Sequence, residues 1–161
     1  MKKVILLLIA VFFTAINAKA LTKSEKQEMV RQFSVFQKAL ESKDGNTLKG
    51  MIKFPVVLID YGRDYDELMK ERDFLDEVDY IAEELKGIAY LKVNTADNSF
   101  SDYLQKGHAC DLKYTGGFKE NELRITAKFV PGEYDACGSI IVYKFKMYKN
   151  KLKLFDVERK Y

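Results

Sequence analysis

Apolar residues recur at a spacing of three and four near the start of the chain, which predicts an amphipathic helix. This helix is expected to begin at a cap on Thr22 or Ser24 and to reach about Ser42. The sequence "KDGN" follows, and Gly45 is the expected stop. A short second helix is expected over about 47–52.

A second amphipathic stretch predicts a helix over about 73–85, ended by Gly87. At 100° per residue its apolar positions fall on one side: Phe74, Val78, Ile81, Ala82 and Leu85. The opposite side is acidic: Asp73, Asp76, Glu77, Asp79, Glu83 and Glu84. A solvated face is the ordinary interpretation. The alternative is an interaction face for a basic partner, centred on Asp76, Asp79 and Glu83.

Strand patterns occupy most of the remaining chain. The segments "FPVVLIDY" and "IAYLKV" predict strands, and residues 94–107 predict a polar loop with room for one helical turn. The segment "ACDLKYT" is expected to turn at Gly116-Gly117 into the alternating strand "ELRITAKFV". "PGEYDACG" then connects to the last two strands.

Lysines occupy alternate positions in the closing segment "IIVYKFKMYKNKLKLFDVERKY", residues 140–161. Asn tolerates a positive φ, so a turn is expected at Lys149-Asn150. The alternation predicts a half-buried antiparallel hairpin with its lysines in water. Lysines on an exposed face also discourage edge-to-edge pairing.

Asp156 stands where this alternation is ambiguous. Strict continuation from Leu152 and Leu154 points Asp156 and Glu158 inward, which makes Asp156 a candidate general base in a pocket. A bulge near Phe155 instead turns Asp156 outward and points Phe155 and Val157 inward. The sequence favours the bulge, because burying an acid without a partner is costly.

Residues 1–20 have the pattern of a secretory signal peptide. Lys2 and Lys3 precede an apolar segment over 4–16, and Ala18-Lys19-Ala20 precedes the expected cleavage point. No cysteine lies near that point, so a lipoprotein is not expected. The mature part, 21–161, is expected to be one domain of a bacterial protein, periplasmic or secreted, without a stable membrane anchor.

The net charge of the full chain is +3, from 27 basic and 24 acidic residues. Three of the lysines lie in the expected signal peptide, so the mature part is neutral and nucleic-acid binding is not expected. Residues 60–84 hold eleven acids and three bases, whereas 141–161 hold seven bases and two acids. We expect the two segments to lie close together and compensate each other. A polar partner surface is the alternative.

The chain has two cysteines, Cys110 and Cys137. In an oxidising compartment an isolated pair predicts a disulfide, which would stabilise the fold by about 3–4 kcal/mol in the chain-entropy model. Two free thiols or a metal pair are weaker interpretations, because other ligands and metal-binding spacings are lacking. Neither a metal nor a cofactor is expected.

Few residues suggest catalysis. His108 is the only histidine and no nucleophile motif accompanies it, so a structural or solvated role is favoured. Asp60, Tyr61 and Tyr65 follow the first expected strand, where a carboxylate beside phenols could bind or abstract a proton. A polar strand end is the favoured interpretation. With Asp156 these residues are the candidate pocket.

Three segments together suggest a family. "FQKALESKDGNTLKGMIKFPV" gives a helix, a break, a short helix and a strand; "RDFLDEVDYIAEELKGIAYLKV" gives a third helix leading to a strand; "VYKFKMYKNKLKLFDV" gives the last hairpin. This order resembles the nuclear-transport-factor-2-like fold, the cone-shaped α+β family that includes ketosteroid-isomerase-like enzymes. The resemblance implies N-terminal helices packed on a curved, mainly antiparallel sheet, with a C-terminal hairpin. A cystatin-like fold is the alternative.

That resemblance leaves the function open. Family members include isomerases, dehydratases, small-molecule binders and non-catalytic interaction proteins such as immunity proteins. Their catalytic residues have no motif-level match here, so none is transferred. The sequence predicts a non-catalytic binding module, of the immunity or inhibitor type, with a protein partner. The alternative is a small pocket enzyme or binder acting on an apolar small molecule.

Overall fold

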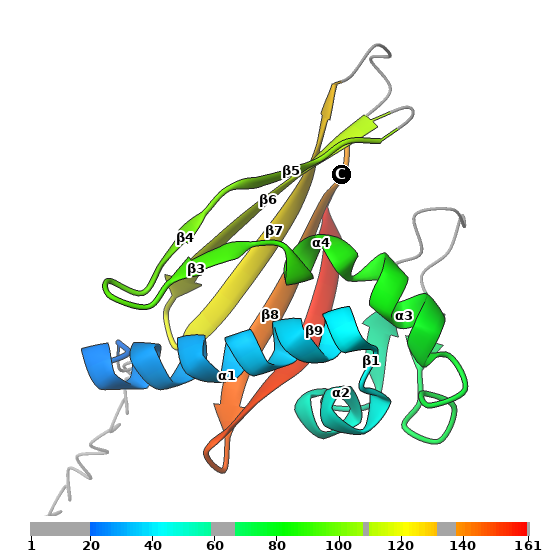
Figure 1. Cartoon of the computed structure of the whole chain (residues 1–161), viewed down its shortest axis with the longest axis horizontal. Helices are drawn as coiled ribbons and strands as arrows, with labels where there is room; N and C mark the ends of the chain where they lie inside the picture. Colours follow the sequence, from blue (N-terminus) through cyan, green and yellow to red (C-terminus); the bar gives the residue numbers. More distant parts are fainter. Residues whose placement is uncertain (1–19, 59–66, 108–109, 132–137, 161) are drawn as a thin grey trace, which may run out of the picture.

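The computed structural model describes residues 20–58, 67–107, 110–131 and 138–160. Helices come first in the chain and an antiparallel sheet of five strands completes it. Helix α1 (Lys23–Ser42) lies across one face of this sheet, and α3 (Val78–Glu84) and α4 (Lys86–Ala89) lie beside it (Figure 1). The expected α+β class is confirmed. None of the described helices is long and apolar enough to span a membrane.

Helix α1 begins where the sequence predicts. Thr22 accepts a hydrogen bond from the Glu25 backbone N–H at 3.2 Å, and the Glu25 carboxylate accepts one from the Thr22 N–H at 2.7 Å. This reciprocal capping box satisfies donors that the first turn leaves open. The end of the helix differs from the prediction. Lys43 adopts the left-handed conformation (φ 54°), and Gly45 is the first residue of α2 (Gly45–Met51) rather than a stop.

The sheet is a meander in the order β5-β6-β7-β8-β9. Its strands are β5 (Tyr103–Gln105), β6 (Cys110–Lys119), β7 (Glu122–Pro131), β8 (Ile140–Tyr148) and β9 (Lys151–Lys160). Strands β8 and β9 pair across Lys149 and Asn150, which have φ values of 47° and 63°. Two successive left-handed residues make a tight turn whose twist suits the strands.

The glycine pair of β6 is not a turn, contrary to the prediction. Strand β6 continues to Lys119, and the chain reverses at Glu120, which has a φ of 57°. Gly116 instead lies against the ring of Phe100: a Cβ at this position would be 2.5–2.9 Å from three Phe100 carbon atoms. Glycine is therefore needed here for close packing.

The short elements were the hardest to predict. Strands β1 (Val56–Leu58) and β2 (Glu67–Met69) form one hairpin, and β3 (Lys92–Asn94) and β4 (Ser99–Ser101) form another. The loop expected over 94–107 was wrong, since it contains β4 and β5. The strand expected for "IAYLKV" was wrong in its first half, since Ile88 and Ala89 belong to α4. Three-residue strands are too short to show a period of two.

The acidic helix is shorter than predicted. Residues 71–77 form turns, and α3 begins only at Val78. Gly87 does not end a helix but lies inside α4. The predicted apolar side is nevertheless correct, because Phe74, Ile81 and Leu85 are buried in the core.

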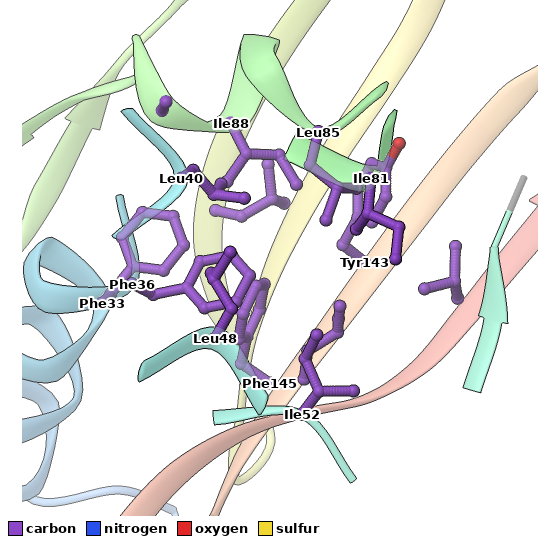
Figure 2. Close-up of a cluster of buried hydrophobic side chains, with 14 of the residues drawn as sticks. Phe33, Phe36, Leu40, Leu48, Ile52, Ile81, Leu85, Ile88, Tyr143 and Phe145 are labelled. Carbon is purple, nitrogen blue, oxygen red and sulfur yellow. The ribbon is translucent and has the colours of Figure 1, made fainter. Parts of the chain in front are cut away.

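The core lies between the helices and one face of the sheet (Figure 2). Phe33 and Phe36 of α1 meet Phe145 of β8 edge to face, with ring centroids 5.3 Å and 5.2 Å apart. Further buried side chains surround these rings: Leu40, Leu48, Ile52, Ile81, Leu85, Ile88 and Tyr143. Edge-to-face aromatic pairs stabilise beyond their burial. Among the described residues, the buried positions between the helices and the sheet are thus occupied mainly by apolar and aromatic side chains that pack together.

One polar side chain is buried beside this cluster. Gln37 is 8% exposed, and its Nε2 lies 2.9 Å, 3.3 Å and 2.7 Å from the carbonyl oxygens of Ile88, Ala89 and Leu91. Ile88 and Ala89 are the last residues of α4 and Leu91 follows it, so these carbonyls belong to a helix end, where intrahelical donors run out. Gln37 therefore joins α1 to the end of α4.

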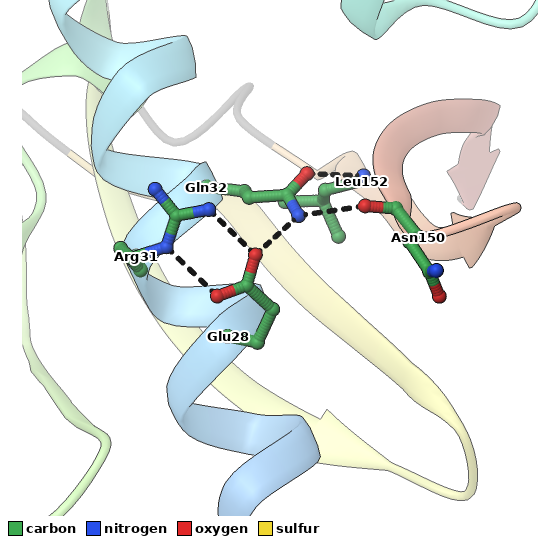
Figure 3. Close-up of polar contacts among 5 residues, drawn as sticks. All are labelled: Glu28, Arg31, Gln32, Asn150 and Leu152. Carbon is green, nitrogen blue, oxygen red and sulfur yellow. Dashed lines mark hydrogen bonds and ion pairs between the residues drawn. The ribbon is translucent and has the colours of Figure 1, made fainter.

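A second glutamine joins α1 to the β8–β9 turn (Figure 3). The Gln32 side chain accepts from the Leu152 N–H at 2.6 Å and donates to the Asn150 carbonyl at 2.9 Å and to the Glu28 carboxylate at 2.6 Å. Arg31 also donates to this carboxylate, and the bonds from Arg31 and Gln32 lower the Glu28 pKa to about 2. The Gln32 amide pairs with the turn much as the backbone of a neighbouring strand would.

Candidate interaction surface

The predicted interaction residues lie together on an exposed surface. Helix α3 buries Ile81 and Ala82 and half-buries Val78 and Glu84, so its outer side carries the remaining residues. Asp79 and Glu83 lie on this outer side, and Asp76 lies in the turn before it. Two large apolar side chains are exposed among them, Leu75 (43%) and Tyr80 (38%). We call these five residues the α3 surface: Leu75, Asp76, Asp79, Tyr80 and Glu83.

The acids of the α3 surface are only weakly neutralised. Asp79 lies 3.1 Å from the Lys43 amine, and Glu83 lies 2.9 Å from the Lys86 amine, whose hydrogen bond lowers the Glu83 pKa. Asp76 has no ion-pair partner in the part of the chain that the structure describes. Solvent screens exposed pairs strongly. The surface therefore keeps a negative field.

The sequence did not indicate the apolar members of this surface as functional. Leu75 and Tyr80 interrupt the acidic side of the predicted helix, and this interruption is the signal that could have identified them. Tyr90, after α4, is 45% exposed and packs on Tyr103 with ring centroids 5.6 Å apart. Tyrosines and exposed apolar residues ringed by charge are typical of protein interfaces.

Asp156 lies on the outer face of the sheet, so the predicted bulge is confirmed. Lys144 pairs with Asp156, whereas the next residue, Phe145, pairs with Leu154; Phe155 is therefore the additional residue in β9. The Lys144 amine donates to the Asp156 carboxylate at 2.7 Å, and this bond raises the Lys144 pKa.

The residues around the bulge agree only in part with the prediction. Val157 is 5% exposed and lies in the core, as expected. Phe155 does not point into the core: it is half-buried, and its ring packs against Tyr148. At a bulge, two successive residues of one strand lie opposite a single residue of its partner, and their side chains point to the same face. Phe155 therefore shares the outer face with Asp156.

We expect Asp156→Asn to change the free energy of unfolding by less than about 1 kcal/mol. Asp156 is 44% exposed, and Lys144 keeps Glu158 as a partner at 3.0 Å. Urea denaturation of both proteins measures the change. Leu154→Ala, on the buried side of the same strand, is the positive control and should cost about 2–5 kcal/mol. Loss of a measured activity in the folded Asn variant would contradict an outward, non-catalytic role.

Four of the candidate pocket residues lie outside the described residues, namely Asp60, Tyr61, Tyr65 and His108. Cys137 is also outside them, while Cys110 begins β6, so the disulfide stays a prediction. The expected signal peptide likewise lies outside. Within the described ranges, no three His, Cys, Asp or Glu side chains gather as metal ligands would.

The expected compensation between the acidic and basic segments stays a prediction. Acids from 67–84 pair with Lys43, Lys49 and Lys86, or with a neighbour in their own segment. Acids of β9 pair with Lys144 and Lys160. None of these ion pairs joins the two segments, but Glu84 of the first and Arg159 of the second make further interactions, and residues 60–66 lie outside the described ranges.

Comparisons with known proteins add no relative from which a function could be transferred. A scan against models of protein families finds no match, and a search of curated proteins finds no significant match. The function is therefore argued from the geometry of the chain itself.

Proposed function

We propose that this protein is a secreted, non-catalytic binding module that docks a basic protein on its α3 surface. One observation carries the proposal: Asp76, which has no ion-pair partner among the described residues, and the exposed, solvent-screened acids Asp79 and Glu83 share one surface with Leu75 and Tyr80. Apolar anchors surrounded by charge suit a folded protein partner better than a small molecule. An immunity or inhibitor role, in which such a module blocks a basic secreted protein, fits this surface.

The proposed fold family is the nuclear-transport-factor-2-like cone. Its support is the element order of helix, short helix, strand and helix before a curved antiparallel meander. In such a cone a pocket enzyme would need an ionisable group reaching the interior. Among the described residues the ionisable groups that reach the interior include the phenols of Tyr114 and Tyr143 and one carboxylate oxygen of Glu84. The enzyme alternative would use such a group or the candidate pocket residues outside the described ranges.

Electrostatic steering gives the proposal a measurable signature. A charged surface attracts an oppositely charged partner before contact and so raises the association rate constant. Salt weakens this attraction, since the Debye length is about 10 Å at 0.1 M. Association through the α3 surface should therefore slow as salt is added, whereas a purely apolar contact should not.

Reversal of Asp76, Asp79 and Glu83 to lysine should slow association about tenfold or more at low salt and flatten its salt dependence. The partner is first captured from a periplasmic extract on the immobilised mature protein. Surface plasmon resonance with the purified partner then gives the rate constants of both proteins.

The matched control reverses three exposed acids on other elements, Asp97, Asp102 and Glu120. It changes the net charge equally and leaves the α3 surface intact. Equal slowing in both variants would mean that only total charge matters. An unaltered rate constant in the α3 variant, with its fold intact by circular dichroism, would rule out this surface as the docking site.

A further inference from the structure

A hollow of about 430 Å³ lies between α1, α2 and the β8–β9 turn. We call it the α2 groove. Its walls include the apolar side chains of Val35 and Met51, the latter half-buried, and the polar groups of Asn46 and Thr47. Val35 is 42% exposed, so the groove presents an apolar wall to solvent.

Gly50 leaves the α2 side of this groove open. A Cβ built on Gly50 meets no atom within 4 Å, so α2 presents bare backbone there. The other side of α2 faces the α3 surface: a Cβ on Gly45 would lie 3.1 Å from Leu75, and Lys49 lies 3.7 Å from Glu71. The α2 groove and the α3 surface are therefore neighbours separated by α2.

The rim of the α2 groove is basic. Lys151 lines the groove and has no acidic partner in the described part of the chain. Lys149, in the adjoining turn, likewise has no acidic partner within those residues. Arg31 also lines the groove but is held by Glu28. The groove thus offers unneutralised positive charge beside an apolar floor.

We propose that two copies of this chain associate through these surfaces, the α3 surface of each entering the α2 groove of the other. The proposal rests on the proposed function and names the partner of the α3 surface. Acids with Leu75 and Tyr80 on one side match lysines with Val35 and Met51 on the other. Because α2 lies between the two surfaces, a two-fold axis beside α2 forms both contacts at once and closes the assembly at a dimer.

Sedimentation equilibrium of the mature protein tests the dimer across concentration and salt. The dimer dissociation constant should rise at least tenfold from about 50 to about 300 mM salt, since the contacts are charged. Gly50→Phe fills the groove and should raise the constant at least tenfold at the lower salt concentration. Phenylalanine is a better helix former than glycine, so α2 should persist.

Gly117→Phe is the matched control for Gly50→Phe. Its Cβ also meets no atom within 4 Å, and it lies in β6, away from the groove. It should leave the dissociation constant unchanged. Equal weakening by both variants would overturn the proposal, as would a wild-type protein that stays monomeric up to about 1 mM at low salt.

A charge exchange gives the sharper test. One variant carries Asp76, Asp79 and Glu83 reversed to lysine; the other carries Lys149 and Lys151, at the rim of the groove, reversed to glutamate. Each variant alone should be monomeric. A mixture should restore association to within about tenfold of the wild type, and a mixture that stays monomeric overturns the proposal.

These outcomes separate the two proposals. A monomeric wild type whose captured basic partner still depends on the α3 acids overturns the dimer and leaves the binding function standing. A dimer with the predicted charge exchange supports the inference, even if association with a captured partner ignores the α3 acids. In that case the proposed binding of a separate basic protein is contradicted, whereas the dimer is not.

Discussion

Gln37→Glu is expected to lower the free energy of unfolding by about 3 kcal/mol or more at pH 7. Gln37 is 8% exposed and donates toward three carbonyl oxygens at the end of α4. A carboxylate has no proton to donate and would place a buried negative charge against these oxygens. This combination is among the few single changes expected to have so large an effect.

The same variant should be sensitive to pH in a defined direction. The protonated carboxyl group can donate one hydrogen bond, so the folded variant should hold the pKa of the introduced carboxyl group above its unfolded value of about 4.3. A raised pKa contributes stability below the unfolded value and loses it as pH rises through the folded value. The defect should therefore be smallest near pH 4 and grow toward pH 7.

Urea denaturation of wild type and variant at pH 4, 5, 6 and 7 measures this trend. Gln37→Leu removes the donor without adding charge and should cost about 1–3 kcal/mol, independent of pH. Gln27→Glu, on the exposed side of the same helix, should be nearly neutral. A Gln37→Glu defect that does not change with pH would contradict the buried hydrogen-bond geometry.

Gly87→Ala is expected to destabilise the protein by about 3 kcal/mol. A Cβ at this position would fall within the ring of Tyr114, which is 1% exposed and packs against Tyr103. Gly87 is itself buried, so both partners of this contact lie in the interior. Without such a contact, alanine in a helix would instead gain about 0.5–1 kcal/mol over glycine.

Gly50→Ala provides the matched control, because the space around its Cβ is open. It should stabilise α2 by about 0.5–1 kcal/mol. In a Tyr114→Leu background, Gly87→Ala should lose most of its cost, which gives a coupling energy above about 1 kcal/mol. Thermal unfolding of the four proteins completes the cycle. A Gly87→Ala protein as stable as the wild type would contradict the close packing.

The glycines show which features local sequence patterns do not predict. The sequence presents Gly87, Gly45 and Gly116 as breaks, since glycine commonly ends helices and forms turns. In the structure Gly87 and Gly116 instead let Tyr114 and Phe100 approach the backbone. Which large side chain lies opposite a glycine depends on tertiary packing, and no local pattern encodes it.

The elements with strong periodicity were predicted well. The start of α1, the buried side of α3 and the alternation along β8 and β9 all follow from apolar spacing. The bulge in β9 was predictable from the cost of burying Asp156. Strands β4 and β5 were missed, because three residues of mixed polarity carry no period.

The candidate surface was only half predictable. The acids of α3 were identified from their shared side of a helix, whereas the α2 groove was not, since it forms between segments distant in sequence. Lys151 and Val35 become neighbours only when the β8–β9 turn lies against α1. Lys149 and Lys151 are exposed as expected, whereas Lys144 is half-buried and pairs with Asp156 and Glu158, which the alternation alone did not show.

The contact between Gln32 and Asn150 also sets the order in which the chain can fold. These residues are 118 positions apart, and the Phe33 ring likewise packs on Phe145. At roughly 5–20 residues per second, synthesis reaches Asn150 roughly 6–24 s after Gln32. The sequence pattern of helix α1 is the clearest in the chain, yet the sheet that covers its apolar side is synthesised only after this interval. Packing of α1 on the sheet is therefore a late step in the folding of the chain.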